Sequence, residues 1–560
     1  MTMSATPPLP IEARVAATLI VLRDGPRGLE VLLLRRAERP GDQNSGAAVF
    51  PGGLLDPADG SHHALCGGLD DVAASARLGL PAGGLNYWIG AIRECFEESG
   101  LLFATDASGA MVDLARFPAD ELFALRRSLH ANKIGMAELC ARLNVRLSAA
   151  DLAYYSHWIT PLGMPKIFDT RFFIAEAPAG QTALHDGGES VEVLWLTPAE
   201  ALDKARALKL MHVTSVTLKH LAGFATAAEA VAAARAQDVV PVTRPRLAIG
   251  PKGRTPVDRG AWAFAEIGRL DPQGRGHVST ELLPGRGVWL SPRVLRVTAP
   301  NGNMMTGPGT NSYFIGAPGG DEWALLDPGP VDAAHVEALR QAAPGKVTRI
   351  LVTHTHKDHS PAAAALKEAT GAPTFGRVAD FSEWQDTAFV PDHRVEDGER
   401  IALGEGVTLR AIHTPGHASN HLCYLLEEEK LLFTGDHLMQ GSTVVINPPD
   451  GDMAAYFASL ERLLAEDIEW LAPGHGFLID EPHAVVRMTI AHRLGREAKV
   501  LVAVTAHGPA EAATLLPIVY ADTPVRLHGV ALRSLQAHLQ KLHGERAVGL
   551  DGQGRWWIRK

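Results

Sequence analysis

The chain has 560 residues, a length that predicts about three or four domains. Apolar residues make up 46% and charged residues 21%, which is typical of globular protein and excludes a disordered or fibrous chain. The sequence has no run of about 18 apolar residues, and its first residues lack the pattern of a signal peptide, so we expect a cytoplasmic protein without a membrane partner. Four cysteines without metal-site or disulfide spacing fit a reducing compartment.

The net charge of −10 is unevenly distributed along the chain. Residues 485–560 contain 11 Lys and Arg against 5 Asp and Glu, a charge of +6, so the rest of the chain carries −16. A basic tail on an acidic body indicates contact with a polyanion. The solvated surface of a small helical domain would account for the same charge.

The first region alternates strand patterns with helical patterns. The strand patterns lie at Val15–Leu22, Val31–Leu34, Arg171–Ala175 and Val191–Leu196, and the helical ones at Ile89–Ser99, Pro198–Arg206 and Ala225–Ala236. The following passage is rich in Pro, Gly and Arg and has weak periodicity, which is typical of a linker. We therefore expect a first domain over residues 1–236 and a linker over 237–286.

Residues 93–101, Arg-Glu-Cys-Phe-Glu-Glu-Ser-Gly-Leu, combine a helical pattern with three acidic positions. On a helix, Glu94, Glu97 and Glu98 share one face. Three like charges there are unfavourable unless a cation joins them, and carboxylate oxygens favour Mg²⁺ or Mn²⁺. Arg93 can pair with Glu97, and Gly100 can end the helix. A solvated acidic helix face is the alternative, but it does not require the arginine, the glycine or the apolar positions.

This segment resembles the signature of the Nudix hydrolases, which cleave a diphosphate linked to another moiety. The resemblance implies an α/β/α sandwich in which Glu94 and Glu98 are catalytic, all three glutamates bind Mg²⁺ or Mn²⁺, and Arg93 contacts the substrate. The chain departs from the signature upstream, because Asp59 follows Gly53 and residues 60–92 replace a short spacer.

A similarly interrupted signature occurs in the peroxisomal coenzyme A diphosphatase branch of that family. Residues 46–53, Gly-Ala-Ala-Val-Phe-Pro-Gly-Gly, fit the end of its coenzyme A pattern, and residues 169–173 are also similar to that branch. The resemblance gives Gly52 and Gly53 as substrate-binding residues and coenzyme A, acyl-CoA or another nucleoside diphosphate derivative as the substrate. Alternatively, the glycine pair forms only the turn before the inserted residues.

A second α/β region starts near Ser291, and ligand-type side chains follow its strand patterns. The strands are expected at Ala324–Leu326, Arg349–Val352, Thr408–Ile412, Leu422–Leu426, Leu431–Phe433 and Trp470–Leu471. The ligand-type residues are His354, His356, Asp358, His359, His417, Asp436 and His475. Histidine and carboxylate suit zinc, with iron and manganese as alternatives. Any one of them alone would be an ordinary loop residue, but together they indicate a metal centre.

The set resembles the five motifs of the metallo-β-lactamase superfamily, with Asp327 matching the first motif. The resemblance implies an αββα sandwich over residues 287–484 with two Zn²⁺ ions and Asp358 as a catalytic residue. One ion would take His354, His356 and His417, and the other Asp358, His359 and His475, with Asp436 between them. Two cations lower the pKa of a shared water, which then attacks as hydroxide. Phosphodiesters, thioesters and lactams are all susceptible to such attack.

The bridging Asp436 is typical of the glyoxalase-II and ribonuclease-like members rather than of true lactamases. Residues 305–313, in which Asn311 is a substrate-binding candidate, and the tail resemble the lactamase-β-like protein 2 family, which cleaves single-stranded RNA. In the tail, Pro524–Leu542 predicts a helix and residues 547–558 a strand–turn–strand. A winged helix is therefore expected over residues 485–560. Trp556 and Trp557 offer stacking surfaces for RNA, or they pack within this domain.

The sequence therefore predicts an α/β and α+β multidomain protein that is a bifunctional metal-dependent hydrolase. Its Nudix half would cleave a diphosphate, and its metallo-β-lactamase half would cleave single-stranded RNA. In one alternative the second half is a glyoxalase-II-like thioesterase. In another the chain is a metabolite-sensing, nucleic-acid-binding regulator, which the complete sets of ligand residues disfavour. The oligomeric state is not predicted.

Overall fold

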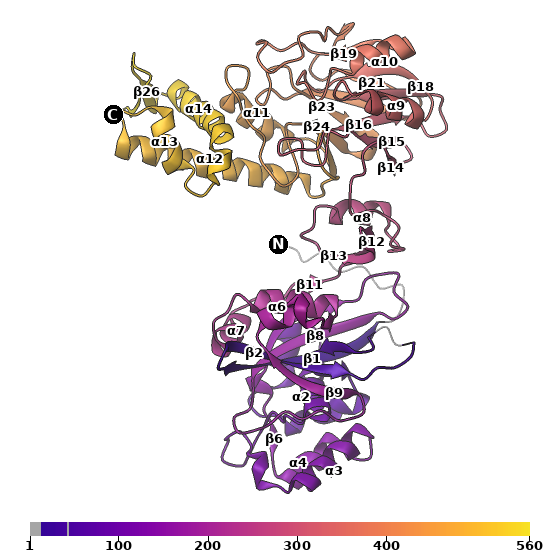
Figure 1. Cartoon of the computed structure of the whole chain (residues 1–560), viewed down its shortest axis with the longest axis vertical. Coiled ribbons are helices and arrows are strands. Elements are labelled where there is room, and N and C mark those ends of the chain that lie inside the picture. Colours follow the sequence, from indigo (N-terminus) through magenta and orange to yellow (C-terminus); the bar gives the residue numbers. More distant parts are fainter. Residues whose placement is uncertain (1–12, 42–43, 560) are drawn as a thin grey trace. The chain divides into compact units, whose positions relative to one another are not determined.

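The computed structural model describes residues 13–41 and 44–559, which form two compact units. The first unit runs to Leu247 and takes in Gln273–Arg275, and the second comprises Ala248–Pro272 and the chain from Gly276 onward. Figure 1 shows the course of the chain from indigo to yellow. Within the described ranges, no helix combines the length and the apolar character needed to cross a membrane.

A mixed sheet forms the centre of the first unit, in the order β10-β3-β2-β1-β8-β7-β11, with β4 paired to β1 and β9 to β2. Its strands are β1 (Arg14–Gly25), β2 (Gly28–Arg36), β3 (Ala47–Val49), β4 (Gly52–Leu54), β7 (Ala153–Ile159), β8 (Phe168–Glu176), β9 (Ser190–Leu196), β10 (Lys209–Leu210) and β11 (Val242–Thr243). A separate short pair is formed by β5 (Ala104–Thr105) and β6 (Arg146–Leu147).

Helices cover both faces of this sheet. Side chains alternate in direction along each strand, so successive residues pack against helices on opposite faces. Leu19 and Val21 of β1 pack in the core that contains α2, whereas Ile20 and Leu22 pack in the core that contains α6 and α7. The helices are α1 (Asp71–Leu78), α2 (Leu85–Ser99), α3 (Ala119–His130), α4 (Met136–Leu143), α5 (Pro198–Leu202), α6 (His212–Leu221) and α7 (Ala227–Arg235). The predicted α/β/α sandwich is confirmed.

The second unit is built on two sheets. The first has the order β14 (Gly287–Ser291), β15 (Val294–Thr298), β16 (Asn311–Gly316), β17 (Glu322–Leu326), β18 (Lys346–Leu351), β19 (Thr374–Gly376), β20 (His393–Arg394). The second has the order β21 (Arg400–Ala402), β22 (Thr408–His413), β23 (Leu422–Leu426), β24 (Leu431–Gly435), β25 (Trp470–Pro473).

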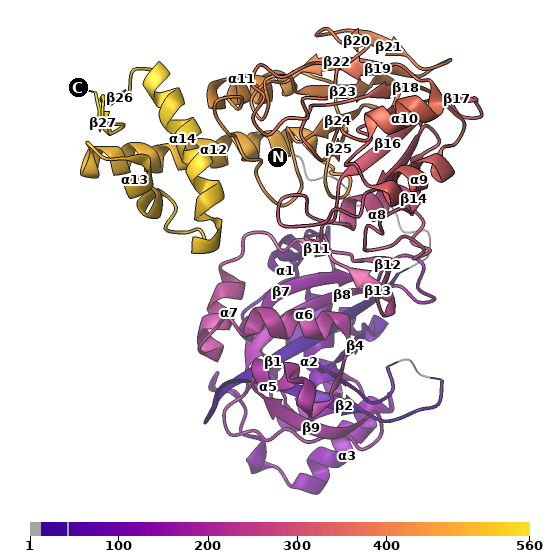
Figure 2. The ribbon, with the colours of Figure 1, turned by 45° about the horizontal axis from the view of Figure 1, so that its top comes forward.

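The two sheets pack face to face and carry helices on their outer faces (Figure 2). Between them, the rings of Tyr313 and Phe433 stack edge to face with centroids 4.9 Å apart. The outer face of the first sheet packs on α9 (Ala333–Ala342) and α10 (Ala363–Thr370), and that of the second on α11 (Met453–Leu463). The predicted αββα sandwich is confirmed.

The chain ends in three helices and a hairpin, which confirms the predicted winged helix. The elements are α12 (Pro482–His507), α13 (Ala512–Val519), α14 (His528–Gly544), β26 (Val548–Leu550) and β27 (Trp556–Ile558). The helix expected from Pro524 starts later, because Val525–Leu527 form a 3₁₀ turn before α14. Trp556 is buried in the domain core, whereas Trp557 is 38% exposed.

Part of the segment expected as a linker, residues 237–286, is folded into the second unit. It contains β12 (Arg246–Gly250), β13 (Gly253–Val257) and α8 (Phe264–Leu270). The α8 residue Glu266 accepts two hydrogen bonds from the guanidinium of Arg296, at 2.7 and 2.8 Å, and one from the backbone N–H of Leu478, at 2.8 Å. Glu266 and Arg296 are almost completely buried. This ion pair joins α8 to β15.

The substitution Glu266→Ala is expected to lower the free energy of unfolding of the second unit by about 3–5 kcal/mol, because it strands the buried Arg296 charge without a partner. Denaturant unfolding followed by tryptophan fluorescence measures this loss. The control is Glu281→Ala, which removes an exposed carboxylate of the same segment and should leave the midpoint unchanged. An unchanged midpoint for Glu266→Ala would show that the pair does not stabilise the fold.

The winged helix contains a buried acid–base cluster that predicts acid sensitivity. Glu497 accepts a hydrogen bond from Lys541 at 2.9 Å and lies 3.4 Å from Nδ1 of the fully buried His538. Burial lowers the pKa of His538 below its ordinary value. Burial alone would raise the pKa of Glu497, but hydrogen bonds from His538 and Lys541 hold it below its ordinary value.

When the pH falls below about 6.5, the ordinary pKa of histidine, His538 is protonated in the unfolded chain but stays neutral in the folded one. The free energy of unfolding therefore falls as the pH is lowered. Protonation of Glu497 at still lower pH removes its contribution as well. The thermal midpoint of the winged helix should be lower at about pH 5.5 than at about pH 7.5, and His538→Gln should reduce this difference. Calorimetry at the two pH values measures it. Equal pH dependence in the variant would contradict the role of His538.

Candidate active sites

The second unit brings the imidazoles of His354, His356 and His417 together. Nε2 of His354 lies 2.9 Å from Nδ1 of His356, and Nε2 of His417 lies 3.0 Å from the same atom. One ring nitrogen of each residue therefore points at a common volume, as three ligands of one ion would.

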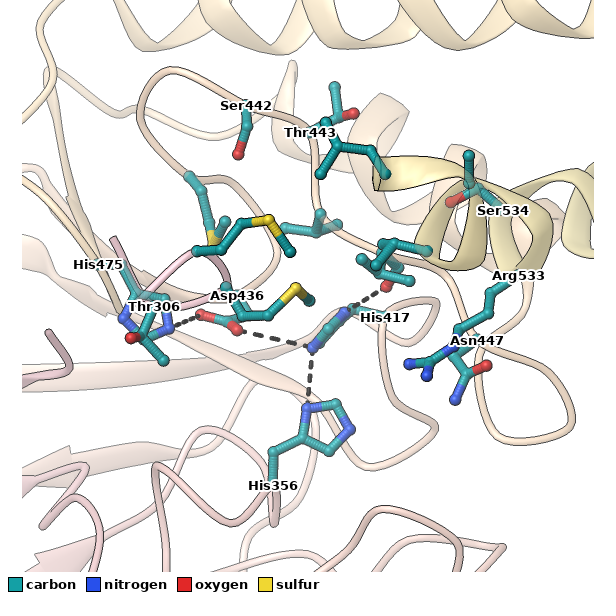
Figure 3. Close-up of a pocket in the computed structure, with 18 of the residues that line it drawn as sticks. Thr306, His356, His417, Asp436, Ser442, Thr443, Asn447, His475, Arg533 and Ser534 are labelled. Atoms are coloured by element: carbon teal, nitrogen blue, oxygen red, sulfur yellow. Dashed lines mark hydrogen bonds and ion pairs between the residues drawn. The ribbon is translucent and has the colours of Figure 1, made fainter. Parts of the chain in front are cut away.

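A second group lies beside the first and consists of Asp358, His359, Asp436 and His475. Nε2 of His475 is 3.4 Å from Oδ2 of Asp358 and 3.3 Å from Oδ1 of Asp436. The other oxygen of Asp436 is 3.8 Å from Nε2 of His417, so this carboxylate faces both groups (Figure 3). All seven residues named from the sequence meet at one place.

The ligand residues meet because they follow strands that end at the same edge of the sandwich. The loop 353–359 follows β18, and His417, Asp436 and His475 come after β22, β24 and β25. The glycine that ends β24 is required, since Gly435 has φ +45° and a Cβ there would lie 2.7 Å from Oγ1 of Thr353. This close approach places Asp436 next to the histidine loop.

Hydrogen bonds to the second nitrogen of the imidazoles fix their orientation. Nδ1 of His417 lies 2.7 Å from the carbonyl of Val445, and Nδ1 of His475 lies 3.2 Å from the carbonyl of Gly309. A carbonyl partner requires the proton on Nδ1, so Nε2 is the nitrogen that faces the centre and would coordinate a cation. Neither carbonyl partner is recognisable from the sequence, because any residue type supplies a carbonyl.

Asp327 lies behind the ligands. Its carboxylate accepts hydrogen bonds from the backbone N–H of Thr353 at 2.7 Å and from the hydroxyl of Thr353 at 2.9 Å, and it lies 3.0 Å from Nδ1 of His359. Oγ1 of Thr353 is also 3.0 Å from Nδ1 of His354. The residue that matches the first motif therefore orients the histidine loop.

Two further positions need comment. No pattern in the sequence singles out His421, whose buried Nε2 accepts a hydrogen bond from the backbone N–H of Asp436 at 3.2 Å and so positions this residue. Asn311, predicted to contact substrate, is instead fully buried, and its amide donates to the carbonyls of Pro473 and Gly476 at 3.1 and 2.8 Å. Asn311 therefore braces the loop that carries His475.

The protonation states of this centre fit cations. Burial lowers the pKa of His354 well below its ordinary value and that of His356 to about 3, so both rings are neutral and able to coordinate. Burial opposes charge on His475, but the Asp436 and Asp358 carboxylates raise its pKa to about 9. The proton on His475 thus supplies positive charge next to the two carboxylates, and a bound metal ion would supply this charge in its place.

Unpartnered atoms point the same way. In the described part of the chain, Nε2 of His359 and Oδ1 of Asp436 are buried and make no hydrogen bond, although they lie within ion-pair distance of one another at 3.5 Å. A buried polar atom without a hydrogen bond is costly, and a shared cation would satisfy both. The donor set of nitrogen and carboxylate oxygen therefore fits two divalent metal ions.

A cavity of about 570 Å³ opens onto this centre. The exposed surface of its lining is mainly apolar, although polar and basic side chains such as Lys357, Asn447 and Arg496 also line it, and α12 and α14 of the winged helix complete it (Figure 3). Among the lining side chains are Met305, Met439, Val444 and Val530.

In the first unit, the three predicted glutamates lie on α2 against the loop of β4. Oε2 of Glu98 accepts a hydrogen bond from the backbone N–H of Gly52 at 3.0 Å. A Cβ at Gly53 would lie 2.6 Å from the carboxylate of Glu94, so a larger residue would displace this carboxylate from its present position. The glycine pair is thus tied to the glutamates.

Arg93 holds this arrangement from the other side. Its guanidinium donates to both oxygens of Asp59, at 3.0 and 3.2 Å, to Glu94 at 2.8 Å and to Glu97 at 3.4 Å. Asp59 is almost fully buried. Arg93, predicted to bind substrate, is therefore engaged in positioning the glutamates. The inserted residues 60–92 form α1 and the first turns of α2, which leave the helical spacing of the glutamates intact.

The glutamates also need compensation of their charge. Burial raises the pKa of Glu94 to about 7 and that of Glu98 well above its ordinary range. Hard carboxylate oxygens on one helix face fit a divalent cation of the magnesium type. The carboxylate oxygens of the three glutamates converge less than the ligand atoms of the second unit. Among the described residues, only the two histidine-containing groups have ligand atoms that all lie within 4.8 Å of the others in the same group.

Comparison with known families supports three domains. The Metallo-beta-lactamase superfamily matches residues 305–475, the NUDT19 Nudix domain matches residues 70–212, and the Beta-lactamase associated winged helix domain matches residues 512–556. These matches confirm the resemblances drawn from the sequence.

Three similar proteins illustrate them. The atrochrysone carboxyl ACP thioesterase of Aspergillus chevalieri is 32% identical over 288 residues, covering 48% of this chain and 88% of that protein. The Beta-lactamase-like protein 2 homolog of Drosophila melanogaster is 30% identical over 269 residues, covering 46% of this chain and 89% of that protein. A NUDIX hydrolase structure from Alicyclobacillus acidocaldarius has 26% identity and a TM-score of 0.33, covering 40% of this chain and 97% of that one.

Proposed function

We propose that this chain, a metal-dependent hydrolase that belongs to the metallo-β-lactamase superfamily and carries a Nudix domain, cleaves two different bonds of coenzyme A-type substrates. The second unit would hydrolyse an acyl thioester, and the Nudix unit would hydrolyse the diphosphate. The observation that carries the first assignment is the largely apolar cavity beside the histidine centre, which suits an acyl group and a pantetheine arm better than a nucleotide chain. Similarity to an ACP thioesterase supports it.

In the second unit, two Zn²⁺ ions would be held by the two groups of ligands described above, and when bound they would supply an activated water and polarise the thioester carbonyl. Burial opposes ionisation of Asp358, but the neighbouring imidazoles hold its pKa to about 2, so it is a carboxylate at neutral pH. It lies at the cavity wall, where it can orient the water and accept its proton. The leaving thiolate, with a pKa of about 8.5, needs little help from an acid.

In the first unit, Glu94, Glu97 and Glu98 would hold Mg²⁺ or Mn²⁺, which when bound would neutralise charge on the diphosphate. Glu98 is held by Gly52 N–H, and Glu94 by Arg93, so each carboxylate has a fixed orientation. A diphosphate bound to that cation would lie near the glycine loop of β4, because Gly52 and Gly53 contact Glu98 and Glu94. This contact supports the proposed role of the two glycines in substrate binding.

The test is a substrate screen of the purified chain loaded with Zn²⁺ and Mg²⁺. Acyl-CoA should yield a free thiol, and coenzyme A should yield two phosphate monoesters by cleavage of its diphosphate. Nucleotide sugars and single-stranded RNA serve as competing substrates. Turnover of RNA without turnover of any thioester would refute the thioesterase assignment, and diphosphate cleavage confined to nucleotide sugars would refute the coenzyme A assignment.

Single-stranded RNA is the second candidate for the second unit, favoured by the basic tail and by the exposed Trp557 of the wing. Several of the basic charges are engaged within the domain, however. Arg496 and Lys499 pair with Asp522 at 2.8 and 2.6 Å, and Arg555 pairs with Asp551 at 2.9 Å. RNA binding through the remaining charges should weaken steeply with salt, and a flat salt profile would remove this candidate.

The four cysteines support a further proposal, a cytoplasmic location. All four are buried free thiols. Secreted proteins rarely keep four unpaired cysteines, because oxidising compartments favour disulfides.

A further inference from the structure

The winged helix forms one wall of the cavity beside the histidine centre. Its residues Val530, Arg533 and Ser534, on α14, line the same cavity as Asp436 and His417 (Figure 3). Any substrate that enters the cavity therefore contacts side chains of α14.

The winged helix is firmly attached to the ligand loops. Arg493 of α12 is 3% exposed and donates a hydrogen bond to the carbonyl of Val444. The next residue, Val445, supplies the carbonyl that orients His417. Between α12 and α14, Glu497 accepts a hydrogen bond from Lys541 at 2.9 Å. These contacts connect α14 to the loop that orients His417.

Trp384 also lines this cavity, next to Arg533 of α14. Its indole is 55% exposed, and its backbone has φ +69°, a region that bulky residues avoid. The neighbouring Gln385 holds this conformation. Its amide donates to Asp450 at 2.9 Å and accepts from the hydroxyl of Thr355 at 2.7 Å, and its backbone pairs with His356. Trp384 is therefore presented to solvent by the metal-binding loop itself.

Arg533 stacks on this tryptophan, with its guanidinium carbon 4.6 Å from the ring centroid. The other arginines of the cavity are engaged, since Arg493 donates to Val444 and Arg496 to Asp522 and the carbonyl of Val519. Among the described residues, Arg533 has no hydrogen-bond or ion-pair partner, and its contact is with the ring of Trp384. A stacked guanidinium keeps its N–H donors in the plane, where they can bind a phosphate with two parallel hydrogen bonds.

We propose that Arg533, held on Trp384, binds the phosphate of a phosphopantetheine arm and so makes the winged helix the specificity element of the second unit. This inference rests on the proposed thioesterase function. The apolar cavity would take the acyl group and the pantetheine chain, and the thioester would lie at the histidine centre. Coenzyme A and an acyl carrier protein both present this phosphate, so the chemistry recognised is the same for both.

The test compares thioesters of one acyl group with and without the phosphate. Acyl-CoA and acyl-phosphopantetheine carry it, whereas acyl-pantetheine and an acyl-N-acetylcysteamine do not. In Arg533→Ala, kcat/KM for the phosphate-bearing substrates should fall by about tenfold to a hundredfold, mainly through KM, because a charge-assisted hydrogen-bonding partner is lost. The phosphate-free substrates should be unaffected. Arg533→Lys should restore part of the loss, and Trp384→Ala should reproduce the loss in milder form.

The matched control is Arg526→Ala, which removes an exposed charge of the same domain outside the cavity lining. Bound zinc and circular dichroism show whether each variant is folded. Equal effects of Arg533→Ala on both substrate classes, or no effect, would overturn the phosphate site while leaving the thioesterase function intact. Absence of turnover of every thioester by the unchanged chain would overturn both. Comparison of acyl-CoA with an acyl carrier protein shows which of them supplies the arm.

Discussion

The substitution Asp358→Ala is expected to lower kcat/KM of the second unit for thioesters by about 10²–10⁴-fold, the range typical of a lost proton acceptor. The alanine removes a carboxylate that is ionised at neutral pH and lies 3.4 Å from His475. It also takes one ligand from the second group, so zinc content measured by elemental analysis should fall. Both readouts follow from the same missing oxygens.

Two companions make this result interpretable. Asp358→Asn keeps one oxygen ligand but no negative charge, so zinc content should be higher than in the alanine variant while the rate stays low. Glu405→Ala removes an exposed carboxylate from a loop of the same unit and should change neither quantity. Diphosphate cleavage by the first unit should be unaffected by Asp358→Ala. Full zinc content together with full activity in Asp358→Ala would exclude the assigned centre.

The residues of the two histidine-containing groups could be named from the sequence because each one carries a local signal. A short apolar run predicts a strand, and a glycine or a proline–glycine pair after it predicts a turn, so His417, Asp436 and His475 could be placed at strand ends. The same holds for Glu94, Glu97 and Glu98, whose common face follows from helical spacing alone. Sites built from residues next to helices and strands can therefore be predicted from the sequence alone.

The supporting residues carry no such signal. Glu266 was assigned to a linker because its own segment is irregular, and its partner Arg296 lies in a strand thirty residues later. His421 is one buried histidine among several, and only the fold shows that it receives the N–H of Asp436. Asn311 looks like a substrate contact in its motif but is satisfied by two carbonyls. Pairings between distant segments decide these roles.

A net charge does not show where the charges of the tail lie. Arg496, Lys499 and Arg555 pair with acids of the same domain, but these pairs leave the excess of +6 unchanged. Two other arginines of the domain, Arg493 and Arg533, line the cavity beside the histidine centre. The position of α14 at the cavity wall is a consequence of tertiary packing. The side of the winged helix that faces the histidine centre, rather than its outer surface, is therefore the side that a substrate in the cavity contacts.

The substitution Glu98→Gln should abolish diphosphate cleavage. We expect the rate of cleavage to fall by about 10²–10⁴-fold, the range typical of a residue that also transfers a proton. Glutamine has the volume of glutamate and can still accept the hydrogen bond from Gly52, so the fold of β4 and α2 should be kept. Glutamine lacks the negative charge that favours binding of a divalent cation. The affinity of the Glu98→Gln protein for Mg²⁺, measured by calorimetry, should therefore fall together with the rate.

The control for Glu98→Gln is Glu121→Gln, an exposed position on α3, which should leave rate and affinity unchanged. Thioester hydrolysis should persist in Glu98→Gln, because the histidine centre lies in the other compact unit and shares no ligand with α2. Loss of both activities in a folded Glu98→Gln protein would mean that the two reactions depend on one another. Retention of diphosphate cleavage would mean that the cation binds elsewhere than on this helix face.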